Sequence, residues 1–109
     1  GKEVQLEREA ERLVALLEAA RARSQLSGVP VQWRLEETGF RFDGLDAAQL
    51  PKQWLDPDTS ASPGATLLLG PEPIIGAQSL TLQSRSRPGQ SVRIATDGLR
   101  PFAVQSTSP

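Results

Sequence analysis

The fold is decided by residues 2–30, KEVQLEREAERLVALLEAARARSQLSGVP, in which a helical pattern gives way to an extended one. Residues 2–26 contain neither glycine nor proline and are rich in Glu, Arg, Leu and Ala, which are strong helix formers. Gly28 has the position of the left-handed residue that closes a helix, and Pro30 prevents the helix from continuing. The stretch therefore predicts one long helix that ends just before Gly28.

The predicted helix is amphipathic. At about 100° per residue, six apolar or small side chains fall within roughly 40° of one line along the helix. These side chains are Leu6, Ala10, Leu13, Leu17, Ala20 and Ser24. We expect this stripe to be buried against the protein's own β-sheet, and we expect Arg21 and Arg23 to complement the negative end of the helix dipole.

The start of the helix has no capping signal, because no Ser, Thr, Asp or Asn precedes its first residues. At about 1.5 Å per residue the helix is roughly 38 Å long, whereas a globule of this size is about 34 Å across. We therefore expect residues 1–27 to be the C-terminal half of a longer helix. Residues 28–109 are expected to form a β-rich globular part, so that residues 1–109 make a single domain.

Six stretches after Pro30 have the pattern of β-strands, with apolar side chains at every second position or in short buried runs. The first two predict a hairpin, and the last three predict an antiparallel meander with a turn at Asp97-Gly98. Pro101 cannot donate to a ladder, so the last strand is expected at an edge or a bulge. The stretches span residues 31–35, 40–42, 65–69, 78–84, 90–96 and 99–105.

These elements predict an α+β fold, in which a long N-terminal amphipathic helix packs on an antiparallel β-sheet or sandwich. Neither an internal repeat nor a βαβ alternation is present. Residues 56–64 have turn chemistry throughout and predict a mobile surface loop, which is also a candidate partner contact.

Composition excludes much of the commonest site chemistry. The 109 residues contain no Cys and no His, so a disulfide, a thiolate nucleophile, an imidazole base and a zinc site built on these ligands are impossible. A net charge of −1 argues against a dedicated nucleic-acid binder. We expect a protein that is not an enzyme and has no catalytic or cofactor-binding residues; an enzyme would require Lys52 as a general base in a cleft.

Two local clusters of polar residues are better explained by structural roles than by a binding site. Residues 56–60 offer oxygen ligands but lack the regular spacing and the closing Glu of a calcium loop, so no metal site is predicted. Four arginines in the C-terminal half have no aromatic residues alternating with them, which favours solvated turns over a base-stacking surface. They are Arg85, Arg87, Arg93 and Arg100.

The outer face of the helix carries the most distinctive charge pattern. Acidic side chains gather on one flank and basic side chains on the other, an arrangement suited to side-by-side packing of subunits in a filament. We expect partner contacts at Arg8, Glu11, Arg12 and Glu18. The alternative is a solvated surface with local pairs such as Glu18 with Arg21, each worth only tenths of a kcal/mol.

Several motifs resemble those of a known family. They are residues 13–21 (LVALLEAAR), 27–31 (SGVPV), 39–42 (GFRF) and 97–102 (DGLRPF). Together they resemble the H-type minor pseudopilin of the bacterial type II secretion system, in the type IV pilin-like superfamily. Proteins of this kind resemble one another in having a short leader, which prepilin peptidase removes, and a hydrophobic membrane segment; neither is present in this sequence.

The resemblance implies a structural role. Such a subunit would join the minor pseudopilins of I, J and K type at the pseudopilus tip to the major pseudopilin of the shaft. It would be a single-pass protein of the inner membrane, anchored by an N-terminal helix that is missing here, with this domain in the periplasm. Two alternatives stay open: a minor pilin of type IV pili, and a peptide-binding or carbohydrate-binding β-module with a groove around Trp33 and Trp54.

Overall fold

The computed structural model describes residues 2–46 and 48–105, with side chains from Gln5 onward. Within these residues the chain forms one helix, α1 (Lys2–Ser27), followed by seven strands. The strands are β1 (Val31–Leu35), β2 (Phe40–Asp43), β3 (Thr59–Ala61), β4 (Thr66–Gly70), β5 (Gln78–Ser84), β6 (Arg87–Thr96) and β7 (Ala103–Gln105).

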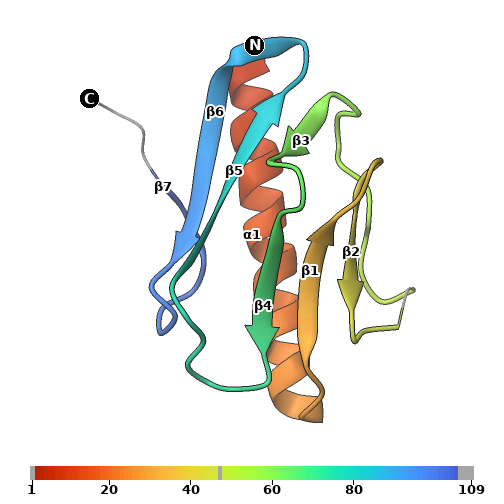
Figure 1. The fold of residues 1–109 in the computed structure, drawn as a ribbon, viewed down its shortest axis with the longest axis vertical. Coiled ribbons are helices and arrows are strands. Elements are labelled where there is room, and N and C mark those ends of the chain that lie inside the picture. Colours follow the sequence, from red (N-terminus) through yellow and green to blue (C-terminus); the bar gives the residue numbers. More distant parts are fainter. Residues whose placement is uncertain (1, 47, 106–109) are drawn as a thin grey trace.

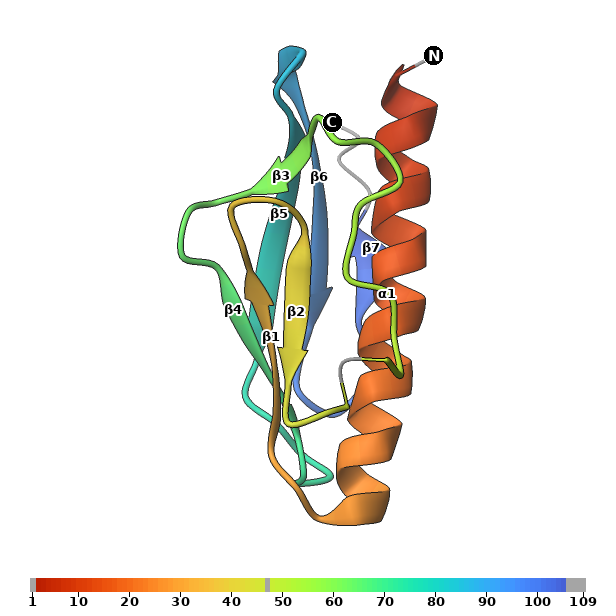
Figure 2. The ribbon, with the colours of Figure 1, turned by 90° about the vertical axis from the view of Figure 1, so that its right-hand side faces the viewer.

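The strands make two antiparallel sheets, with the orders β2-β1-β4 and β3-β5-β6-β7. Figure 1 shows the sheets side by side, and Figure 2 shows both on the same side of α1. Strands of both sheets contact the helix. The α+β prediction is therefore confirmed, whereas the sandwich alternative is not: the two sheets form one layer and the helix forms the other.

Helix α1 has the predicted length, and its predicted apolar stripe faces the core. All six side chains of the predicted stripe, from Leu6 to Ser24, are buried. The helix ends at Gly28, whose φ is 73° and whose N–H donates to the carbonyl of Ser24 over 2.9 Å. The longest dimension of the molecule is 40 Å, and α1 runs along most of it (Figure 2).

The first sheet carries an aromatic cluster on the side that faces the core. Trp33 of β1 and Phe40 of β2 are fully buried, with ring centroids 5.7 Å apart. Trp54, from the loop after β2, packs edge-on against Phe40 at 4.8 Å. Burying one such side chain is worth about 1.5–3 kcal/mol. The cluster and the helical stripe belong to one hydrophobic core that also contains apolar side chains of β4, β5 and β6.

The prediction of a loop over residues 56–64 is wrong at its centre. Thr59–Ala61 forms strand β3, which pairs with the end of β5, and both Thr59 and Ala61 are buried. This strand was not predicted because it lies between turn residues and its three residues, Thr-Ser-Ala, show no alternation of apolar and polar side chains. Asp56 does act as a turn residue: its Oδ1 accepts the N–H of Asp58 over 2.9 Å.

The last two strands also differ from their predicted bounds. Strand β6 begins at Arg87 and includes Pro88, which is tolerated there because β7 pairs only with the Arg93–Ala95 part of β6. Strand β7 begins at Ala103 instead of residue 99, so Pro101 precedes an edge strand. Asp97 holds the intervening loop, because its Oδ1 accepts the backbone N–H groups of both Leu99 and Arg100.

A buried carboxylate fixes the N-terminal half of α1 to the loop before β3. Glu9 is 1% exposed. Its two oxygens accept the backbone N–H groups of Leu55 (3.0 Å) and Asp56 (2.8 Å) and the hydroxyl of Thr59 (2.7 Å). Three donors offset the cost of removing the charge from water, so the helix and the loop are joined by a polar contact inside the core.

Arg21 makes the corresponding contact near the other end of the helix. The expectation that it serves the helix dipole is wrong, because its side chain is buried under the loops that follow β4 and β6. Its guanidinium donates to the carbonyls of Gly98 (3.0 Å), Arg100 (3.2 Å) and Pro73 (3.3 Å). These carbonyls belong to irregular backbone. The carbonyl of Gly98 also accepts the N–H of Ile75, and that of Arg100 also accepts the hydroxyl of Thr96, so Arg21 adds a further donor to loops that are already hydrogen-bonded.

One side chain joins the two sheets. The amide of Gln78, at the start of β5, donates to the carbonyl of Leu68 over 2.8 Å and accepts its N–H over 2.7 Å. Leu68 lies on β4, whose other edge pairs with β1. The Gln78 side chain therefore takes the place of a paired strand at the seam between the sheets.

Replacing Glu9 by alanine is expected to destabilise the domain by about 3 kcal/mol, because two backbone N–H groups and a hydroxyl lose their acceptor inside the core. Urea unfolding followed by circular dichroism measures the change. Glu11→Ala is the matched control, since Glu11 is exposed on the same helix and should stay within about 0.5 kcal/mol of the parent. Equal losses in the two variants would contradict the role given to Glu9.

Replacing Gln78 by alanine is expected to cost about 1–2 kcal/mol, because both hydrogen bonds across the seam are lost. Amide hydrogen exchange gives a local readout: the N–H of Leu68 should exchange faster, while the N–H groups paired between β5 and β6 keep their protection. Gln83→Ala, at an exposed position of the same strand, serves as the control. Unchanged exchange at Leu68 would mean that Gln78 does not hold the seam.

Candidate assembly surface

The face of α1 that points away from both sheets is the largest surface that the core leaves uncovered on this element (Figure 2). Arg8 and Glu11 are exposed there, and neither has a partner among the side chains that the structure describes. At about 100° per residue, both lie more than 130° from the line through Leu6 that faces the core. These two charges therefore point directly into solvent.

The other two predicted contact residues are used within the chain. Arg12 is half-buried, and its Nη1 donates to the carbonyl of Gln53 over 2.9 Å. Glu18 accepts the N–H of Phe102 over 2.9 Å, and the same oxygen lies 3.8 Å from the guanidinium of Arg21. The predicted Glu18–Arg21 pair thus exists, but it lies against the sheet-side loops instead of on an open surface.

Small side chains occupy the middle of this outer face. Ala15 and Ala22 are exposed and Ala19 is half-buried, so the backbone is covered thinly over two turns. Leu26, one turn further, is 89% exposed. Helices approach one another most closely where the side chains between them are small, so a second helix could pack closely on this face. We define the outer helix face as Arg8, Glu11, Ala15, Ala22 and Leu26.

Only some of the charged side chains on the acidic and basic flanks of α1 are exposed. Glu7 and Glu11 are exposed on the acidic side and Arg8 on the basic side. Arg23, further along the basic side, donates to the side-chain oxygen of Gln49 over 2.9 Å and so joins the loop after β2 to the helix. The charges available to a neighbour are therefore concentrated in the first half of α1.

The aromatic-groove alternative loses one of its two tryptophans. Trp33 is fully buried, so the expectation that it lines a groove is wrong. Trp54 is half-buried and borders a hollow of about 420 Å³, together with Leu55, Pro57 and Arg85. A single accessible aromatic ring is a poor platform for a sugar.

A metal site and a general base at Lys52 are two further chemistries that the sequence raises. In residues 2–46 and 48–105 no three carboxylates come together as a metal site would require. Lys52 is exposed, and its carbonyl accepts the N–H of Phe40.

Residues 2–46 and 48–105 contain no helix that is both long enough and apolar enough to span a bilayer.

Comparison with known proteins gives one match. The family described as type II transport protein GspH matches residues 9–108. This range covers most of α1, all seven strands and the seam between the sheets. Neither the curated proteins nor the solved structures gave a match. The chain therefore belongs to the GspH family of type II transport proteins, which are structural pseudopilins of the type II secretion system.

Proposed function

We propose that this protein is a minor pseudopilin that joins the tip complex of a type II secretion pseudopilus to its shaft. Its neighbours would be the minor pseudopilins of I, J and K type on one side and the major pseudopilin on the other. The observation that carries this proposal is the outer helix face, a thinly covered surface that runs along a helix as long as the molecule itself. The family membership supports the same assignment.

The outer helix face suits repeated packing between subunits. The small side chains Ala15 and Ala22 let a neighbouring helix come close, and Leu26 offers an apolar contact at the far end. Arg8 and Glu11 carry opposite charges one turn apart, so they fix the register of a neighbour with the complementary order. Of the contact residues predicted from the sequence, Arg8 and Glu11 are thus the ones proposed to touch a neighbour. Arg12 and Glu18 instead hold the helix to loops of its own chain.

In this proposal, the full-length protein carries a hydrophobic segment upstream of α1. That segment holds the protein in the inner membrane before assembly and places the domain in the periplasm. The genomic sequence upstream of Gly1 tests this part: a basic leader ending in Gly, a Glu at the fifth mature position and about 20 apolar residues are expected. A hydrophilic domain in that place would contradict the assignment.

Reversing the charge of Arg8 or Glu11 is expected to reduce secretion of an exported protein to about a third or less of the parental level. Each reversal replaces an attraction at a contact by a repulsion worth about 1 kcal/mol, and the contact recurs in every assembled pseudopilus. The variants Arg8→Glu and Glu11→Lys are made in the full-length protein, and the exported protein is measured in the medium.

Arg87→Glu is the matched control, because Arg87 is also exposed but lies at the start of β6 instead of on α1. Secretion should stay at the parental level in this variant, and all three isolated domains should keep their melting temperatures. Normal secretion in both helix variants would remove the outer helix face from the proposal.

A further inference from the structure

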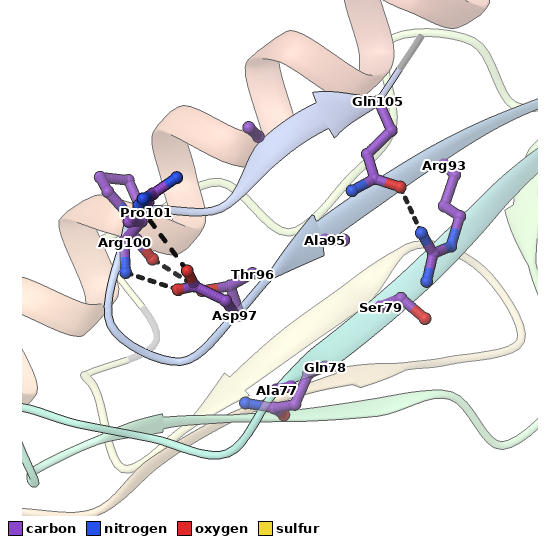
Figure 3. A pocket seen from close by; sticks show the side chains of 11 residues that line it. Ala77, Gln78, Ser79, Arg93, Ala95, Thr96, Asp97, Arg100, Pro101 and Gln105 are labelled. Carbon is purple, nitrogen blue, oxygen red and sulfur yellow. Dashed lines mark hydrogen bonds and ion pairs between the residues drawn. The ribbon is translucent and has the colours of Figure 1, made fainter. Parts of the chain in front are cut away.

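A second surface lies on the sheet instead of the helix. A groove of about 510 Å³ crosses strands β5, β6 and β7 next to the loop that joins β6 to β7 (Figure 3). Ile94 and Phe102 are buried in the core on the helix side. Because side chains alternate along a strand, Arg93, Ala95 and Ala103 point to the opposite face. The groove is therefore separate from the outer helix face.

The floor of the groove is a row of small side chains. Ser79 pairs with Ala95 across β5 and β6, and Ala95 pairs with Ala103 across β6 and β7. At this row β6 is paired on both sides, with β5 and with β7. A molecule in the groove thus lies close to the sheet surface and is recognised by the side chains at its walls.

The two walls come from the next rows along the strands. On one side Arg93 pairs with Gln105, and its guanidinium donates to the Gln105 side-chain oxygen. On the other side stand Asp97, Arg100 and Pro101 (Figure 3). Each wall is about two residues from the floor row, or about 7 Å along the strand, which leaves room for one polypeptide segment.

The charge of the groove is unbalanced. Within the part of the chain that the structure describes, no carboxylate pairs with Arg93, and the side chain of Arg100 is 85% exposed. Arg100 reaches Asp97 only at 3.8 Å. The N–H groups of Arg100 and Leu99 hold the pKa of Asp97 below its usual value, so this carboxylate is charged but occupied by its own loop. The groove thus presents two guanidinium groups and one carboxylate, which gives it a net positive charge.

We propose that this groove binds an acidic segment of a partner protein, with a carboxylate of that segment paired to the guanidinium of Arg93. Gln105 holds one side of this guanidinium, which orients the remaining N–H groups for a carboxylate. The lining residues include no aromatic ring, which disfavours stacked bases or sugars. Arg93 and Arg100, which the sequence placed among solvated turns, are thereby brought to opposite sides of one site.

The test uses the 109-residue domain, labelled with ¹⁵N, and two capped peptides, Ac-EAEAE-NH₂ and its neutral counterpart Ac-QAQAQ-NH₂. The acidic peptide should produce saturable shifts at the amides of Ser79, Ala95 and Ala103 and at the Arg93 side chain. These shifts should weaken with added salt, because the contact is a charge pair. Equal shifts with the neutral peptide would overturn the proposal, since they would indicate pairing with the β7 edge.

Variants at the walls make the test specific. Arg93→Gln should weaken binding of the acidic peptide about fivefold, and Arg93→Glu should abolish it and create binding of Ac-KAKAK-NH₂. Arg87→Gln is the matched control, because it removes an equally exposed arginine outside the groove and should leave the affinity unchanged. All variants should keep the parental melting temperature.

Two results would overturn the proposal. One is an equal loss of affinity in Arg87→Gln, which would indicate attraction to net charge alone. The other is the absence of shifts in the groove together with Arg93-dependent binding to vesicles containing phosphatidylglycerol, which would assign the arginines to a lipid surface. Neither result bears on the outer helix face, so this test is independent of the proposed function.

Discussion

The apolar stripe of α1 is the surface on which the rest of the domain is built. No strand of one sheet is paired with a strand of the other in the part of the chain that the structure describes, and both sheets bury their inner faces against the same helix. Leu13 and Leu17, in the middle of the stripe, are almost completely buried. Removing either side chain from the helix would loosen both sheets at once, because their common partner would be lost.

A helix with one such stripe divides its side chains between two tasks. Those on the inner half make the core and the polar anchors, and those on the outer half are left for other molecules. Ala15 and Ala22 add little to the stability of the fold, which leaves their small size available to a neighbouring helix. Under the proposed function, this division would separate folding from assembly along a single element.

Periodicity explains most of what the sequence predicts correctly. The helix, its buried stripe and the β5-β6-β7 meander follow from patterns that extend over five or more residues, and the first hairpin follows from residues 31–35 and the alternation of residues 40–42. Strand β3 was missed because its sequence, Thr-Ser-Ala, shows no apolar alternation between the turn signals. The start of β7 was wrong because the turn at Asp97 uses a side-chain acceptor instead of the favoured two-residue hairpin. The start of β6 was wrong because Pro88 and Gly89 have the composition of a turn although they lie within the strand.

The polar anchors were missed although the sequence contains a signal for them. At about 100° per residue, Glu9 and Arg21 lie only about 60° from the centre of the apolar stripe, on opposite sides of it. A charged residue so close to a buried stripe is a candidate for an internal partner. The partners themselves are loop backbone groups far along the chain, and no local pattern identifies those. No local pattern identifies the groove either, since Arg93 and Arg100 come to its opposite walls only when β6 pairs with β7.

Glu9, Glu18 and Arg21 bind loops at three positions along one helix. Glu9 binds the loop before β3, Glu18 and Arg21 both bind the loop between β6 and β7, and Arg21 also binds the loop after β4. Their directions are set by the helical phase, so inserting or deleting one residue between Glu9 and Arg21 would rotate one anchor by about 100° relative to the others. A change in helix length ahead of Leu6 would, by contrast, leave the relative directions of these three anchors and of the buried stripe unchanged.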